Sequence, residues 1–283
     1  MSRGKTLKLF LIDGEPSGRI KCSLANWTGI AYKISRTALD KCKNIDILKQ
    51  TGVYFLFGTD NSDNPVVYIG QAGIRKNGKG LLLRIQEPHN SIDYWTEAIM
   101  FTTTNNSFGP TEISYLENRF CNMAIEAGRY SVKNGNDPNP GNITEETESE
   151  LEEFIDYAKI VMGALGHKVF EPLAPIADPA DNEPNLYLEY SKAKATGKRT
   201  SDGFVVFKGS VINPSLAKSC PERTIKDREK YANKIDKSNV LTNDILFSSP
   251  SAAAAFVGGA SLSGNALWKD GDGVSLKDII GKT

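Results

Sequence analysis

One carboxylate in this sequence stands where an acidic residue is costly. Residues 111–127 predict a helix, because apolar residues recur at helical spacing and Gly128 follows where a C-terminal glycine belongs. Glu117 falls within the apolar stripe of this helix, next to Leu116. A carboxylate there is unfavourable unless it is paired or binds a metal ion. We therefore expect Glu117 to bind a divalent cation or, alternatively, to form a structural salt bridge with Arg84.

Two tyrosines stand on facing strands of a predicted hairpin. The apolar segments GVYFLFG (52–58) and VVYIG (66–70) are joined by TDNSDNP, which is rich in turn-forming residues. Tyr54 and Tyr68 lie on these two segments, and their hydroxyl groups could act on a substrate from the same side of the sheet. The alternative is that the two rings serve only sheet packing.

Arg84 follows the hairpin on a short predicted helix, LLLRIQE (81–87), which should end near Pro88. A guanidinium group suits a phosphate, although Arg84 could instead extend its side chain to solvent. A strand rich in β-branched and aromatic residues is expected over 94–104, before the helix that carries Glu117.

The order of these features resembles the GIY-YIG nuclease superfamily. GVY (52–54) and YIG (68–70) correspond to the family signature, with Val53 in place of the usual isoleucine. The elements that come after them are a helix with Arg84, a strand, a helix with Glu117 and the downstream Asn134. The resemblance covers roughly 50–165. It implies a GIY-YIG type endonuclease, a phosphodiester hydrolase acting on DNA.

The resemblance also implies roles for these residues. Tyr54 would be the general base on the attacking water, and Tyr68 would orient the water or the phosphate. Arg84 would hold the scissile phosphate, and Glu117 would hold one Mg²⁺ or Mn²⁺. A tyrosine with a pKa near ~10 is a poor base unless its phenolate is stabilised, which a nearby metal and arginine would do.

Further candidates surround this group. Gly70 would let backbone approach the substrate, and His89 would lie at the rim of the site. Asn134 would position neighbouring groups, with Asn136 and Asn142 of the same loop as alternatives. The alternative for His89 is a surface residue after Pro88. The glycine-rich loop 71–79 could wrap a phosphate backbone or be an ordinary surface loop; its basic residues are Arg75, Lys76 and Lys79.

Composition is that of a globular protein, with 40% hydrophobic and 24% charged residues and a net charge of zero. Charge is segregated: residues 1–50 and 191–240 are basic and residues 141–190 are acidic. Basic faces suit nucleic acid, although such runs can be merely solvated surface. Four scattered cysteines argue against a zinc module or a disulfide framework. No apolar run spans a bilayer, so we expect a cytoplasmic protein without membrane contact.

The predicted fold class is α/β (α+β), a small mixed sheet flanked by helices. We expect an N-terminal β-rich extension (1–48), a nuclease domain (49–170), a linker (171–198) and a C-terminal accessory α+β domain (199–283). The two flanks resemble bacterial GIY-YIG proteins with a C-terminal domain of unknown function, whose relatives accompany restriction and modification enzymes. That resemblance implies nucleic-acid targeting in phage defence.

Three readings of the function remain open on the sequence. The first is the metal-dependent DNA endonuclease, which would need a homodimer or two successive events to cut both strands. The second is a catalytically silent module that keeps the fold and binds nucleic acid. The third is an interaction scaffold, which leaves the placement of Glu117 without a reason.

Overall fold

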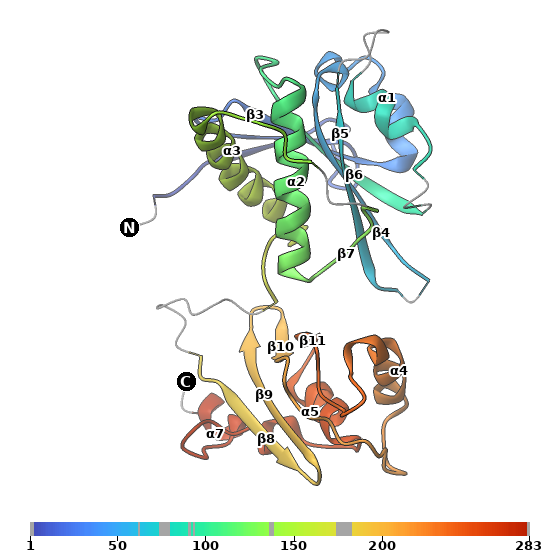
Figure 1. Cartoon of the computed structure of the whole chain (residues 1–283), viewed down its shortest axis with the longest axis vertical. Coiled ribbons are helices and arrows are strands. Elements are labelled where there is room, and N and C mark those ends of the chain that lie inside the picture. Colours follow the sequence, from blue (N-terminus) through green and yellow to red (C-terminus); the bar gives the residue numbers. More distant parts are fainter. Residues whose placement is uncertain are drawn as a thin grey trace. The chain divides into compact units, whose positions relative to one another are not determined.

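The computed structural model describes residues 3–61, 63–73, 80–89, 92, 94–135, 139–173 and 183–281. The chain divides into two compact units, Met1–Glu171 and Pro172–Thr283 (Figure 1). Each unit contains its own sheet with helices, which confirms the predicted α/β (α+β) class.

The first unit is built on a seven-stranded sheet with the order β1-β2-β3-β6-β4-β5-β7. Every pair is antiparallel except β5 with β7. The strands are β1 (Leu7–Leu11), β2 (Ile20–Leu24), β3 (Gly29–Ser35), β4 (Gly52–Thr59), β5 (Pro65–Ala72), β6 (Trp95–Thr103) and β7 (Ser131–Val132).

Helices cover both faces of this sheet. The long helices α2 (Pro110–Ala127) and α3 (Glu145–Ala164) lie on one face (Figure 1). The short α1 (Leu81–Gln86) packs on the other with two 3₁₀ helices, η1 (Arg36–Cys42) and η2 (Asp46–Lys49).

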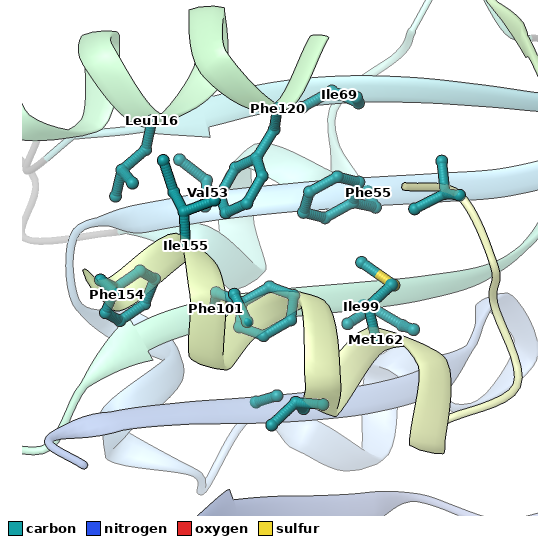
Figure 2. Close-up of a cluster of buried hydrophobic side chains, with 14 of the residues drawn as sticks. Val53, Phe55, Ile69, Ile99, Phe101, Leu116, Phe120, Phe154, Ile155 and Met162 are labelled. Atoms are coloured by element: carbon teal, nitrogen blue, oxygen red, sulfur yellow. The ribbon is translucent and has the colours of Figure 1, made fainter. Parts of the chain in front are cut away.

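Burial on both faces explains why β4 reads as a continuous apolar run. Side chains of a strand alternate between faces. Val53 and Phe55 therefore join the core under α2 and α3 (Figure 2), whereas Tyr54 and Leu56 join the core under α1.

The predicted hairpin and the predicted helix over 111–127 are confirmed as β4–β5 and α2, and Gly128 adopts the expected left-handed conformation. The second long helix begins after Thr144, whose hydroxyl accepts a hydrogen bond from the Thr147 backbone N–H at 3.3 Å.

One expectation for the N-terminal part is wrong. Residues 1–48 are not a separate extension. β3 pairs along its whole length with the central strand β6, so β1, β2 and β3 complete the sheet of the first unit.

The second unit has a four-stranded antiparallel sheet in the order β11-β10-β9-β8. Its elements are β8 (Leu186–Tyr190), β9 (Ala193–Thr200), β10 (Gly203–Val206), α4 (Glu222–Lys230), η3 (Ala232–Lys234), β11 (Ile245–Phe247), α5 (Pro250–Gly258), α6 (Gly264–Leu267) and α7 (Leu276–Ile280).

The predicted linker over 171–198 therefore extends too far, because β8 and most of β9 lie within it. β8 buries Leu186 and Leu188, whereas β9 buries only the small residues Ala193, Ala195 and Gly197. Short buried alanines between charged residues give little strand signal in a sequence.

All four cysteines are free thiols. Among the described helices, none combines the length and apolar composition that a membrane-spanning segment needs.

Candidate functional site

The edge of the first sheet brings the two predicted tyrosines together. Tyr54 on β4 lies directly opposite Gly70 on β5, and Tyr68 is two residues earlier on β5. Tyr68 is therefore the diagonal neighbour of Tyr54 on the same face, and the two ring centroids are 6.2 Å apart. His89, just after α1, completes the aromatic group at 5.7 Å from the Tyr54 ring and 5.6 Å from the Tyr68 ring.

Gly70 has a different role from the predicted approach of backbone to substrate. A Cβ atom at this position would lie 2.5 Å from the Tyr54 hydroxyl and from the ring carbon that carries it. The glycine therefore makes room for the Tyr54 side chain, which lies across β5. This packing gives a physical reason for a glycine two residues after Tyr68 in the YIG sequence.

Gly70→Ala is expected to destabilise the first unit by about 1–3 kcal/mol, the usual cost of overpacking a tight site. It should also displace the Tyr54 hydroxyl. Thermal unfolding measures the first effect, with Gly73→Ala as the matched control, because the nearest atom to a Cβ at Gly73 is 3.9 Å away. Equal melting temperatures for the two variants would contradict the packing role of Gly70.

The hydrogen bonds of His89 fix which of its nitrogens carries the proton. Nδ1 lies 2.6 Å from the backbone carbonyl oxygen of Glu87, and a carbonyl can only accept, so Nδ1 donates. Burial lowers the pKa of His89, which favours the neutral ring. Nε2 is then an acceptor, and the Tyr54 hydroxyl, 3.1 Å away, donates to it. His89 thus lies inside the site and not on the open surface.

Tyr54 is fully buried and keeps its proton. Burial is the main cause that raises its pKa far above the usual value, and the nearby Tyr68 adds to the shift, while Arg84 opposes it. Burial also raises the pKa of Tyr68. Tyr54 alone is therefore a poorer base than a free tyrosine, and His89 is the group placed to receive its proton.

Glu117 projects from α2 to the same edge of the sheet. Its carboxylate accepts a hydrogen bond of 2.9 Å from the side-chain amide of Gln71. Burial raises the pKa of Glu117 to about 7, against the opposing effects of Gln71 and Arg84. The alternative for Glu117, a salt bridge to Arg84, is not found among the described residues, because Arg84 pairs instead with Glu87 at 2.9 Å.

Gln71 is a site residue that the sequence did not single out. It follows Gly70 on β5 and so points to the opposite face, toward α2. Its amide oxygen accepts a hydrogen bond of 3.2 Å from Ser114, which leaves the amide nitrogen directed at Glu117. The signal that points to it is a polar strand residue next to the YIG glycine, on the strand face opposite to that of Tyr68.

The donor set fits a hydrated divalent cation. Glu117 is a half-buried carboxylate with a raised pKa and no ion pair to any described residue. A bound cation would offset the free-energy cost of burying its negative charge. The described part of the chain gathers no group of three or more His, Cys, Asp or Glu side chains. One carboxylate supplemented by water and substrate oxygens suits Mg²⁺, which keeps much of its hydration shell.

Asn134 acts on the backbone of β5. Its side-chain oxygen accepts from the Ile69 N–H at 3.1 Å, and its amide donates to the Ile69 carbonyl at 2.6 Å. It thereby extends the pairing of β7 along the edge next to Tyr68 and Gly70. Its place is that of a positioning residue. The predicted substrate-binding residues Arg75, Lys76 and Lys79 lie outside the described residues.

Comparison with known families gives a match within the second unit. Residues 186–280 match the model of a domain of unknown function, DUF4357. The match spans the sheet from β8 and includes the strands that sequence had assigned to a linker. Comparisons with curated proteins and with solved structures give no match.

Proposed function

We propose that the first unit is a metal-dependent endonuclease of the GIY-YIG type that hydrolyses phosphodiester bonds in DNA. The observation that carries this proposal is the contact of Tyr54, Tyr68 and His89 near one sheet edge. The charges of Glu117 and Arg84 lie close enough to this aromatic group to shift the pKa of both tyrosines. Half-buried Glu117 lacks an ion pair within the described residues, and this favours a cation-binding role over a purely structural one.

Proton transfer would run through Tyr54 to His89. As the Tyr54 oxygen accepts a proton from the attacking water, its own proton passes to Nε2 of His89 along the existing hydrogen bond. The tyrosine then never has to exist as a free buried phenolate. The Glu87 carbonyl holds the other ring nitrogen and keeps Nε2 aimed at the tyrosine.

Arg84 would bind the scissile phosphate and neutralise charge that develops during attack. Glu87 holds its guanidinium from one side at 2.9 Å. Glu87 thus positions two catalytic groups, one through its carboxylate and the other through its backbone. Tyr68, half-buried beside Tyr54, would orient the water or a phosphate oxygen.

Glu117 would hold the cation, and Gln71 would fix the orientation of that carboxylate. The bound Mg²⁺ or Mn²⁺ would supply Lewis-acid stabilisation of the phosphate oxygens. The second unit would then contact nucleic acid and set where the first unit cuts. The protein would act in the cytoplasm in phage defence, and its four free cysteines fit a reducing compartment. A homodimer would supply a second active site for the other DNA strand.

A cleavage assay of the full chain tests the proposal. Labelled single-stranded DNA, duplex DNA and RNA are incubated with Mg²⁺, with Mn²⁺ or with chelator. We expect metal-dependent cutting of DNA. Binding of nucleic acid without cutting under any metal condition would favour instead the catalytically silent module.

A further inference from the structure

The row of cross-strand partners that contains Tyr54 continues to the far edge of the sheet. Met100 lies opposite Tyr54, Tyr32 opposite Met100, Lys21 opposite Tyr32 and Phe10 opposite Lys21. Directly opposed residues of antiparallel strands share a face. Phe10 and Lys21 therefore stand on the same sheet face as Tyr54.

Phe10 is a large aromatic residue that this face leaves in solvent. Its side chain is 62% exposed, although it belongs to a regular strand. Beside it is a hollow of about 450 Å³, called the β1 hollow below. The residues that line it are Phe10, Ile12, Arg19, Lys21, Tyr32, Lys41, Asn44 and Ile45, of which three are basic and none is acidic.

The free positive charge in the β1 hollow comes from its lysines. Asp13 balances Arg19 through an ion pair of 2.7 Å. Lys21 and Lys41 form no ion pair with any residue that the structure describes. An exposed aromatic ring beside unpaired lysines is the arrangement that binds single-stranded nucleic acid, with a base on the ring and phosphates on the cations.

We propose that the β1 hollow and Phe10 bind a single-stranded stretch of the nucleic-acid substrate away from the cleavage site. This inference rests on the proposed function for its ligand class. A base of a single strand offers its face to Phe10, whereas bases of a duplex are already stacked on one another. The surface therefore favours substrates with an unpaired segment.

The sheet geometry sets the length of strand that reaches both places. Four strand spacings of about 4.8 Å separate β1 from β4, a distance of about 19 Å. A stacked strand advances about 3.4 Å per nucleotide, so at least about six nucleotides separate the base on Phe10 from the scissile phosphate, because α1, η1 and η2 cover the sheet between them. A strand of about 20 nucleotides is long enough to occupy both.

The test measures binding by the full chain in the presence of chelator, using fluorescence anisotropy with a labelled 20-nucleotide single strand and the matching duplex. Phe10→Ala is expected to weaken single-strand binding about tenfold and duplex binding little. Lys21→Ala should reduce the slope of log affinity against log salt by about 0.7.

Matched controls lie on the opposite face of the sheet. Leu9→Ala removes an apolar side chain that is 51% exposed on the same strand, and Lys159→Ala removes an exposed charge from α3. Unfolding curves and sedimentation accompany every variant. The proposal would be overturned if Phe10→Ala and Lys21→Ala bound the single strand as well as the controls do. It would also be overturned if Phe10→Ala changed the oligomeric state of the protein and left single-strand binding unchanged.

The outcomes also separate this surface from the proposed activity. If wild type binds single strands in a Phe10-dependent way but never cuts, the activity fails and the surface stands. If wild type cuts DNA and Phe10→Ala binds normally, the surface fails and the activity stands. If wild type binds no single strand at all, the surface proposal fails outright.

Discussion

Tyr54→Phe should lower the cleavage rate by about 10²–10⁴-fold, the range expected for loss of general acid–base catalysis. The substitution keeps the buried ring that packs over Gly70 but removes the hydroxyl that connects the water to His89. Single-turnover cleavage at saturating protein isolates this chemical step from binding.

Tyr157→Phe is the control for Tyr54→Phe. Tyr157 is half-buried on α3, outside both the site and the β1 hollow, and its hydroxyl donates to Glu153 of the same helix at 3.4 Å. Its variant should cleave at close to the wild-type rate. A Tyr54→Phe variant as active as Tyr157→Phe would show that the Tyr54 hydroxyl transfers no proton.

Glu117→Gln should make the metal-free protein more stable at neutral pH than wild type, even though it removes activity. Burial raises the pKa of Glu117 from a normal value near ~4.5 to about 7, so the folded state holds a proton that the unfolded state releases. The stability contributed by the protonated carboxyl is present below ~4.5 and is lost as pH rises through about 7.

Melting temperatures in chelator between pH 5 and pH 8 measure this effect. The difference between Glu117→Gln and wild type should grow with pH, and added Mg²⁺ should stabilise wild type alone. Glu126→Gln serves as the control, because Glu126 is solvent-exposed on the same helix. A difference that does not change with pH would mean that Glu117 is already ionised and satisfied without a metal.

Strong local patterns in the sequence predict much of the fold. The GVY and YIG segments were recognisable as a hairpin because both faces of β4 are buried, and the helix over 111–127 was recognisable from its apolar stripe and its closing glycine. The unusual position of Glu117 in that stripe followed from the same pattern. Each of these signals is contained within a few turns or one strand pair.

What the sequence did not show depends on contacts between distant segments. Gln71 became part of the site only through its hydrogen bond to Glu117, 46 residues away in sequence. The inward position of His89 depends on the tyrosine of β4, and the role of Gly70 depends on the strand register. Pairing of β3 with β6, which joins the N-terminal strands to the main sheet, is likewise non-local.

The central claim is that a cation held by Glu117 drives phosphodiester cleavage, and one comparison tests it most directly. Wild type and Glu117→Gln are incubated with labelled single-stranded and duplex DNA in Mg²⁺, under conditions where both remain folded. We expect wild type to cut at least one substrate and Glu117→Gln to be slower by about 10³-fold, consistent with loss of several kcal/mol of stabilisation by the metal. Equal cleavage by the two proteins, or cleavage by wild type that persists in chelator, would contradict the claim.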